Sequence, residues 1–394
     1  MKQLFLAVVF VLLMTATAYA NAPNISAPIA VVMCFETGDI LYERNMEQRW
    51  IPASMTKIMT AFITYQEIEA GNLTLNTQVR VSQNAHNFSN NRRIEGSFVP
   101  LNNGAYITVD VLLQLLMLPS ANGAAVVLAE HISGTEAAFA ERMNNTAEEL
   151  GMYSSFTNSH GAIAHHSNAY SVAILIREFI QQYPDILRIT AMPSMRFGGT
   201  TYNNTNRLLS THPFTGADGF KTGTIRASGW GHSTTAVRDG RRVIAVVMNA
   251  TNNEQRQSQS RVLLQFGFDE LARREAAAAA RVRVFHRGTI VPLSAPAVVQ
   301  NRELLLPLGD VFRYLDFDLN WDATYRLVRT TGVNGGRITL FVDRPLVFIS
   351  GEAITLTSSA RIIDDRVYVP LQFVALATGT TGIWDFDTGV VRFN

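Results

Sequence analysis

The chain has 394 residues, of which 47% are hydrophobic and 16% charged, and its formal net charge is +1. This composition predicts a globular protein of two or three domains and excludes a disordered chain. Because Lys and Arg are spread along the chain and nearly balanced by Asp and Glu, we expect no nucleic-acid partner.

The first twenty residues have the pattern of a cleaved signal peptide. Lys2 precedes an almost unbroken apolar run over residues 4–14, and Ala18-Tyr19-Ala20 has the small-x-small form of a signal-peptidase site. The apolar run is shorter than the ~20 residues that span a bilayer. We therefore expect a signal peptide at 1–20 and a mature protein secreted to the cell envelope, outside the cytoplasmic membrane. The single cysteine, Cys34, excludes an intramolecular disulfide and is interpreted as a buried strand residue.

The next 250 residues or so alternate between helical and strand-like patterns. Residues 27–44 predict two short strands around the turn Thr37-Gly38-Asp39, whereas residues 71–107 are rich in Asn, Gly and Ser and predict mostly loop or short strand. Helices are expected from about residue 54 to 65 and over 111–117, 124–131, 136–150, 170–182 and 255–266, with strands within 219–249. Helices in the middle and strands at both ends predict an α+β domain whose sheet brings its ends together.

A second domain follows an alanine-rich boundary. Glu275 and the run Ala276 to Ala280 predict a linker over 275–283, between a first domain at 21–274 and a second at 284–394. The second domain repeats itself with an offset of 63 residues, so that Trp321-Asp322 matches Trp384-Asp385. The repeat predicts a small α+β domain of two related units, about 290–331 and 353–394. Both tryptophans are interpreted as core residues, with sugar-stacking platforms as the alternative.

Three short motifs in the first domain carry chemistry when they occur together. In Ser54-Met55-Thr56-Lys57, at the start of a helix, the spacing of three brings the lysine amine within reach of the serine hydroxyl. Ser120-Ala121-Asn122 lies between two helices, where a loop can direct a hydroxyl and an amide into a cleft. Lys221-Thr222-Gly223 lies in a strand, where the first two side chains can bind a carboxylate and the glycine allows close approach. The ordered set is the signature of penicillin-recognising serine enzymes.

Through these motifs, residues 25–270 resemble the D-alanyl-D-alanine carboxypeptidases, the low-molecular-mass penicillin-binding proteins. Further support comes from Asp218-Gly219-Phe220 before the third motif and from Arg238-Asp239-Gly240 before a Val-rich strand. The resemblance implies a β-lactamase/transpeptidase-like fold, with an antiparallel sheet beside a helical lobe. It implies a serine-type enzyme that needs no cofactor and no metal, that removes the terminal D-alanine from peptidoglycan stem pentapeptides, and that is acylated by β-lactam antibiotics.

The resemblance also implies a role for each motif residue. Ser54 would be the acylated nucleophile, Lys57 the general base, Ser120 the relay of a proton to the leaving D-alanine, and Asn122 the residue that orients Lys57 and the substrate amide. The substrate would be bound by Lys221, Thr222, Gly223 and Thr224, and the backbone N–H groups of Ser54 and Thr224 would form the oxyanion hole. One position departs from the usual pattern. Gly123 follows the second motif, where the family usually has Asp or another residue with a side chain, although Gly is also seen.

Two alternatives remain open at this point. A β-lactamase would need a deacylating base that the sequence does not locate, and a non-catalytic wall-binding or penicillin-binding protein is suggested by Gly123 and the repeats. His160, His165 and His166 are interpreted as loop or packing residues, because no Asp, Glu or Cys accompanies them at ligand spacing. The repeats resemble the stalk domain found at the N-terminus of copper amine oxidases, without implying copper, and we expect them to act as a spacer or to contact the cell wall. The strand-like end, residues 390–394, predicts no C-terminal amphipathic anchor.

Overall fold

The computed structural model describes residues 22–91 and 95–393 and divides into two compact units, one ending at Asp269 and the other beginning at Glu270. The expected signal peptide at 1–20 lies outside the described residues. The boundary falls within the helix α9 (Asn253–Ala280), which is much longer than the predicted 255–266 and extends into the expected linker. In the described ranges, no helix has both the length and the apolar character needed to cross a membrane.

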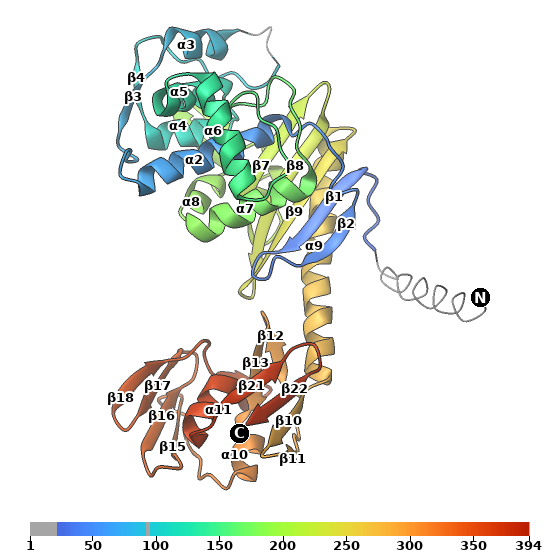
Figure 1. Cartoon of the computed structure of the whole chain (residues 1–394), viewed down its shortest axis with the longest axis vertical. Coiled ribbons are helices and arrows are strands. Elements are labelled where there is room, and N and C mark those ends of the chain that lie inside the picture. Colours follow the sequence, from blue (N-terminus) through green and yellow to red (C-terminus); the bar gives the residue numbers. More distant parts are fainter. Residues whose placement is uncertain (1–21, 92–94, 394) are drawn as a thin grey trace, which may run out of the picture. The chain divides into compact units, whose positions relative to one another are not determined.

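Unit 1 is built on a five-stranded antiparallel sheet in the order β2-β1-β9-β8-β7 (Figure 1). Its strands are β1 (Ile29–Cys34), β2 (Ile40–Arg44), β7 (Ala217–Ile225), β8 (Gly229–Arg238) and β9 (Arg241–Ala250). The first strand pairs with the last, from Ile29 opposite Met248 to Cys34 opposite Val243. The sheet therefore joins the two ends of the domain, as the sequence predicted, and Cys34 is a buried strand residue.

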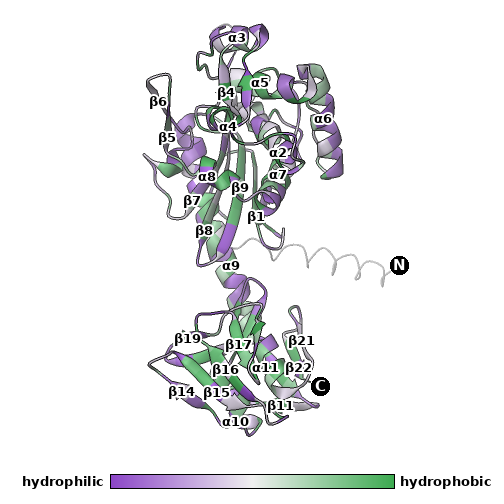
Figure 2. Ribbon diagram, turned by 90° about the vertical axis from the view of Figure 1, so that its left-hand side faces the viewer, coloured by the Kyte–Doolittle hydropathy of each residue, from purple (hydrophilic) through white to green (hydrophobic). Residues whose placement is uncertain are grey.

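Both faces of this sheet are covered, which explains why β1 reads as a continuous apolar run rather than an alternating one. Val31 belongs to the core shared with the helices α2, α4, α5 and α7, while its neighbour Val32 points to the opposite face. On that face a Cβ on Gly267 of α9 would lie 2.9 Å from Val32 Cγ1 and 2.6 Å from Val243 Cγ1. Gly267 thus allows α9 to pack closely on the sheet. Figure 2 shows the strands as largely hydrophobic and the outer face of α6 as hydrophilic.

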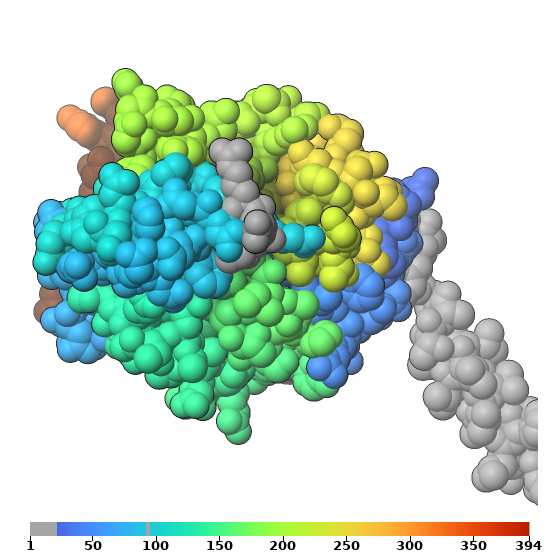
Figure 3. Space-filling view, turned by 90° about the horizontal axis from the view of Figure 1, so that it is seen from above, coloured from blue at the N-terminus to red at the C-terminus, as the bar shows by residue number. Residues whose placement is uncertain are grey.

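The helical lobe covers the other face, and Figure 3 shows its segments, blue to green, beside the yellow segments of the sheet. Its helices are η1 (Ala53–Thr56), α2 (Lys57–Glu69), α3 (Gln83–Asn90), α4 (Val109–Met117), α5 (Asn122–Ser133), α6 (Glu136–Glu149), α7 (Ala169–Gln182) and α8 (Ile186–Thr190). The short pairs are β3 (Gln78–Arg80) with β4 (Tyr106–Thr108) and β5 (Ser194–Phe197) with β6 (Thr200–Asn203), and η2 spans Arg207–Leu209. The expectation that residues 71–107 are mostly loop or short strand is met by β3 and the start of β4 but missed α3. Helix α3 is short and mostly polar, and only its Ala85 and Ser89 are buried, so it lacks the apolar content that identified the other helices, although Ser82 caps it by accepting from Ala85 N at 3.0 Å.

Unit 2 contains three sheets, in the orders β11-β10-β22-β21, β12-β13-β20-β19 and β14-β15-β16-β17-β18. Its first elements are β10 (Arg283–His286), β11 (Thr289–Val291), β12 (Val298–Gln300), β13 (Glu303–Pro307), α10 (Leu308–Tyr314), β14 (Asn320–Asp322) and β15 (Leu327–Thr331). The remainder are β16 (Arg337–Phe341), β17 (Leu346–Ile349), β18 (Glu352–Thr355), β19 (Arg361–Ile363), β20 (Arg366–Pro370), α11 (Leu371–Thr378), β21 (Gly382–Asp385) and β22 (Val390–Phe393).

The 63-residue repeat is visible in the strand pairing of unit 2. Trp321 pairs with Val328 in β14–β15, and Trp384 pairs with Val391 in β21–β22, so the two hairpins have the same register at the predicted offset. The equivalent residues Leu306 and Val369 pair with each other between β13 and β20. The equivalent strands β13 and β20 are therefore related by a local two-fold axis.

The two tryptophans have different surroundings. Trp384 is partly buried against the core of unit 2, with its ring 5.4 Å from that of Phe386, as predicted for a core residue. Trp321 is 42% exposed, so its assignment to the core was wrong.

Candidate active site

Ser54 and Lys57 are brought together by a tight turn of helix. Ser54 lies in η1, a 3-10 turn that leads into α2, and in a 3-10 helix the side chains at i and i+3 eclipse each other. Lys57 Nζ consequently lies 2.9 Å from Ser54 Oγ. The preceding residue, Ala53, has a φ of 48°, in the left-handed region that is unusual for a residue with a side chain. The sequence predicted the start of an α-helix here. The observed 3-10 turn aligns the Ser54 and Lys57 side chains more directly than a turn of α-helix would.

Lys57 is completely buried and joins the first motif to the second. Its Nζ donates to Ser54 Oγ, to Asn122 Oδ1 at 2.8 Å and to the backbone carbonyl of His160 at 2.7 Å. Burial, and then the positive charge of Lys221, lower the pKa of Lys57 well below its usual range. This shift favours the neutral amine, the form that can accept a proton from Ser54. Sequence reasoning missed the His160 carbonyl, because a backbone acceptor leaves no side-chain signal.

The predicted packing histidines support the same turn. Thr56 Oγ1 donates to the carbonyl of Ala53 at 2.6 Å, so the contact of 2.7 Å with His165 Nε2 requires the histidine to be the donor. Burial lowers the pKa of His165 to about 4 and that of His160 to about 3, the latter helped by the charge of Lys57. Both imidazoles are therefore neutral at physiological pH. The two histidines therefore add no positive charge beside Lys57. Such a charge would disfavour the protonated form of Lys57 further.

Ser120 presents a buried hydroxyl at the start of α5. The residue has a φ of 66° and is 3% exposed, and within the described part of the chain its Oγ has no hydrogen-bond partner. A buried hydroxyl without a partner is costly, so its retention beside Ser54 suggests that it is kept for a group that enters the site. Asn122, two residues later, accepts from Lys57 and donates through Nδ2 to the Glu95 carbonyl at 3.2 Å.

Gly123 departs from the usual pattern because α3 occupies the space of a side chain. A Cβ at Gly123 would lie 1.9 Å from Ser89 Oγ, 3.0 Å from Ser89 Cβ and 3.2 Å from the carbonyl oxygen of Ala85. The first contact is shorter than real Cβ atoms show, and the other two are tighter than most Cβ contacts. The glycine thus reflects close packing between α3 and α5 and leaves Ser120 and Asn122 in place.

The third motif lies on β7, against η1. A Cβ at Gly223 would lie 2.4 Å from the Pro52 carbonyl oxygen and 3.2 Å from Ser54 N, so only glycine allows this strand to approach the serine turn. Lys221 is buried, and its Nζ donates to the Thr222 carbonyl at 3.2 Å. Burial, and then the charge of Arg256, lower its pKa to about 7. Thr222 Oγ1 donates to Thr205 Oγ1 at 2.7 Å.

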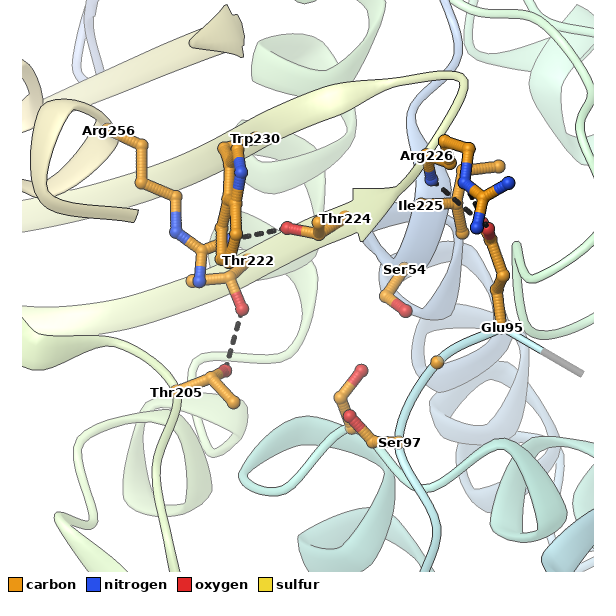
Figure 4. Close-up of a pocket in the computed structure, with 12 residues that line it drawn as sticks. Ser54, Glu95, Ser97, Thr205, Thr222, Thr224, Ile225, Arg226, Trp230 and Arg256 are labelled. Carbon is orange, nitrogen blue, oxygen red and sulfur yellow. Dashed lines mark hydrogen bonds and ion pairs between the residues drawn. The ribbon is translucent and has the colours of Figure 1, made fainter. Parts of the chain in front are cut away.

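A cleft of about 400 Å³ runs past Ser54 between these elements (Figure 4). It is lined by motif residues Ser54, Ser120, Thr222 and Thr224 and by Glu95, Gly96, Ser97, Thr205, Ile225, Arg226, Trp230 and Arg256. In Figure 4 the Arg256 and Trp230 side chains lie at one end, those of Glu95 and Arg226 at the other, and Ser54 between them. Lys57, Asn122 and Lys221 are buried behind this lining. The eight predicted site residues are therefore gathered at one site.

Sequence reasoning missed Arg256, which supplies a fixed cation at one end of the cleft. Its Nη1 donates to Thr224 Oγ1 at 2.9 Å and to the Gly231 carbonyl at 3.2 Å, and its guanidinium lies 4.7 Å from the ring centre of Trp230. Burial, and then the charge of Arg207, lower its pKa to about 10, so it remains charged at neutral pH. Arg256 is on α9, 35 residues after Lys221, and no local pattern indicates that the two face one cleft.

The site therefore combines a hydroxyl nucleophile, a buried amine within hydrogen-bond distance of it, and a cationic end suited to a carboxylate. This combination fits acyl transfer to serine from a substrate with an anionic terminus. Among the described residues, no group of three or more His, Cys, Asp or Glu could hold a metal ion.

Comparisons with known proteins agree with this geometry. Residues 16–252 match the D-alanyl-D-alanine carboxypeptidase family, and residues 286–393 match the copper amine oxidase N-terminal domain. The chain is 34% identical over 252 residues to the D-alanyl-D-alanine carboxypeptidase DacF of Bacillus subtilis, covering 62% of this chain and 62% of DacF. It is also 34% identical over 269 residues to DacD of Escherichia coli, covering 68% of this chain and 67% of DacD. The match thus spans about two thirds or less of these relatives' own lengths.

Solved structures show the same fold for unit 1. Penicillin-binding protein 6B of Escherichia coli superposes with a TM-score of 0.60 and 35% identity, over 63% of this chain and 79% of that one. Penicillin-binding protein D2 of Listeria monocytogenes, in its cefotaxime-bound form, superposes with a TM-score of 0.56 and 28% identity, over 62% of this chain and 98% of that one. Together with the gathered Ser54, Lys57, Asn122 and Lys221, these matches show that the chain belongs to the D-alanyl-D-alanine carboxypeptidase family and carries, after its first unit, a domain of the copper amine oxidase N-terminal type.

Proposed function

We propose that this protein is a serine-type D-Ala-D-Ala carboxypeptidase that removes the terminal D-alanine from peptidoglycan stem pentapeptides. One observation carries the proposal: the buried Lys57 amine lies 2.9 Å from Ser54 Oγ, in a cleft whose far end holds the cation Arg256. The alternative of a degenerate, non-catalytic domain is disfavoured by this intact geometry, since Gly123 changes helix packing and not the contacts of Lys57.

The chemistry follows from the positions of the groups. The terminal carboxylate of the substrate binds at Lys221, Thr222 and Arg256. Neutral Lys57 accepts the Ser54 proton as Oγ attacks the carbonyl carbon of the penultimate D-alanine. Backbone N–H groups of Ser54 and Thr224 stabilise the oxyanion, and each such donor contributes roughly 3–4 kcal/mol in related systems.

Collapse of the tetrahedral intermediate that carries this oxyanion breaks the amide bond. The leaving nitrogen takes a proton relayed from Lys57 through Ser120, whose hydroxyl otherwise lacks a partner among the described residues. Water then attacks the acyl-enzyme with Lys57 as base, which releases the shortened peptide and restores Ser54.

We further propose that the protein is secreted, acts on the cell wall and is acylated at Ser54 by β-lactam antibiotics. The expected signal peptide supports secretion. The Listeria relative has been solved in cefotaxime-bound and ampicillin-bound forms, which supports β-lactams as ligands of this cleft. Unit 2 is proposed to contact the wall, because it is attached to a domain whose substrate is a wall component.

The direct test measures D-alanine release from a soluble pentapeptide together with labelling by a fluorescent penicillin. We expect both in the wild type and neither in Ser54→Ala. Ser258→Ala, which removes an exposed hydroxyl on α9, is the matched control and should retain both. Undiminished labelling of Ser54→Ala would refute the assignment of the nucleophile. Rapid hydrolysis of penicillin without D-alanine release would instead indicate a β-lactamase.

A further inference from the structure

Unit 2 contains a cavity of about 440 Å³ beside α10. Its lining is Ser294, Pro307, Leu308, Gly309, Asp310, Arg313, Leu319, Trp321, Val328, Arg366 and Val367. Buried apolar side chains such as Leu308 and Val328 form part of the lining, and the 42% exposed Trp321 contributes an indole. Most of these residues belong to the first repeat, on and around α10.

The second repeat carries different residues at the equivalent positions. At the offset of 63 residues, Asp310 corresponds to Phe373, Arg313 to Leu376 and Leu319 to Gly382. Phe373 is completely buried, and a Cβ at Gly382 would already lie 3.1 Å from the side chain of Leu371. Trp384, the equivalent of Trp321, packs against Phe386.

The two copies thus share a backbone register but have different side chains at most positions, those that line the cavity among them. A core that only had to be stable could have filled both positions with apolar residues, as the second copy does. The first copy instead keeps a cavity with an aromatic wall and charged residues.

The charges of the cavity favour an anion. The Asp310 carboxylate is buried and accepts from Ser294 N at 2.7 Å, from Ala295 N at 3.3 Å and from Ser294 Oγ at 2.8 Å, so neighbouring donors compensate it. Arg366 Nη1 donates to Ser294 Oγ at 2.9 Å. Arg313 lies 3.9 Å from Asp310, with its side chain 80% exposed. The two guanidinium groups therefore retain donors that can bind a carboxylate.

We propose that this cavity binds a muropeptide, that is, a peptidoglycan saccharide bearing a short peptide with a free carboxylate. The sugar ring would lie on the Trp321 indole, because the apolar face of a pyranose suits an aromatic surface. The carboxylate would lie between Arg313 and Arg366. The inference rests on the proposed function, because that function makes peptidoglycan the polymer on which the protein acts. A second site for the same polymer would raise the effective concentration of stem peptides at Ser54.

The test is a calorimetric titration of the full-length protein with a disaccharide-tripeptide, which has a free carboxylate but no D-Ala-D-Ala terminus. We expect Trp321→Ala to weaken binding by at least about fivefold through loss of the aromatic surface. Arg313→Gln should weaken it by about tenfold or more through loss of a charge-assisted hydrogen bond. A neutral N-acetylglucosamine oligomer of similar length should bind at least about tenfold more weakly than the muropeptide, for the same reason.

Matched controls lie outside the cavity. Tyr325→Ala removes a 70% exposed aromatic residue of the same unit, Arg337→Gln removes an exposed arginine, and both should bind as the wild type does. Arg256→Gln, in the cleft of unit 1, should also leave this binding unchanged. Trp321→Phe keeps an aromatic surface and should retain more binding than Trp321→Ala.

Three results would overturn the proposal: no binding by the wild type, unchanged binding by Trp321→Ala, or loss of binding in Arg256→Gln alone. Release of D-alanine from a soluble pentapeptide separates this proposal from the proposed function. That activity should be unchanged in Trp321→Ala, and its absence from the wild type would refute the carboxypeptidase proposal while leaving the titration to judge the cavity.

Discussion

Replacing Gly123 by alanine tests whether the packing of α3 explains the unusual residue after the second motif. The added methyl would lie 1.9 Å from Ser89 Oγ, and rotation of that hydroxyl would still leave Ser89 Cβ at 3.0 Å. Helix α3 or the start of α5 must therefore move by several tenths of an ångström. Overpacking of this kind costs about 1–3 kcal/mol of unfolding free energy. The neighbouring Asn122 would move with the helix and disturb its 2.8 Å contact with Lys57, so acylation by penicillin should slow by about tenfold or more.

A double-mutant cycle with Ser89→Gly isolates this contact. The Ser89→Gly substitution itself should cost about 1 kcal/mol in a helix, but it removes both close atoms of Ser89. Gly123→Ala should then cost little more in that background, which gives a coupling energy of about 1–2 kcal/mol. Stability is measured by urea unfolding, with loss of fluorescent penicillin labelling reporting unit 1 alone, and acylation is measured by the labelling rate. If Gly123→Ala costs the same in the wild type and in the Ser89→Gly variant, or costs nothing in either, the packing explanation is wrong.

Further predictions concern the charged groups and the strand beside them. First, kcat/KM should rise with pH as Lys57 loses its proton. It should fall above about pH 7, because Lys221, whose pKa is lowered to about 7, then loses the charge that holds the substrate carboxylate. A profile without an alkaline fall would contradict this role for Lys221. Second, the lowered pKa of Lys221 means that the unfolded state binds more protons than the folded state between pH 7 and 10.5. The unfolding free energy of unit 1 should therefore rise with pH over that interval, and Lys221 should contribute at most about 1.4 kcal/mol per pH unit to the rise. The Lys221→Met variant should lack this contribution and should be more stable than the wild type at pH 6. Third, Arg256→Gln should lower the second-order rate of penicillin acylation by about 10–100-fold, the value of a charge-assisted hydrogen bond, whereas an unchanged rate would exclude Arg256 from carboxylate binding. Fourth, Gly223→Ala, whose methyl would lie 2.4 Å from the Pro52 carbonyl, should nearly abolish labelling, and normal labelling would show that β7 can move away from η1 at little cost.

Local pattern was enough to find the motif residues and most of the helices. Ser54 and Lys57 lie three apart, and the separation of one helical turn follows from sequence alone. Thr108 caps α4 by accepting from Val111 N at 3.3 Å, and α4 begins two residues before the predicted start. The order of the three motifs indicated the family, which the comparisons confirmed. Likewise, the 63-residue offset indicated a repeat that strand pairing then showed residue by residue.

What escaped sequence reasoning depended on contacts between distant segments. Arg256 enters the cleft only because α9 packs on the sheet behind β7, and the His160 carbonyl reaches Lys57 only through the path of a loop 103 residues away. The reason for Gly123 lies in Ser89, on a helix too short and too polar to be recognised from its apolar residues.

The sequence by itself identified the three motifs and the internal repeat of this protein, because motif spacing, caps and repeats are properties of neighbouring residues or of a fixed offset. Only the tertiary structure decided the electrostatics of Lys57 and Lys221, since their lowered pKa values arise from complete burial and from cations on other elements. It also decided that Trp321 lines a cavity while Trp384 is packed. Residues at equivalent positions of a repeat can differ in burial in this way, because burial depends on which side chains of neighbouring elements pack against each residue.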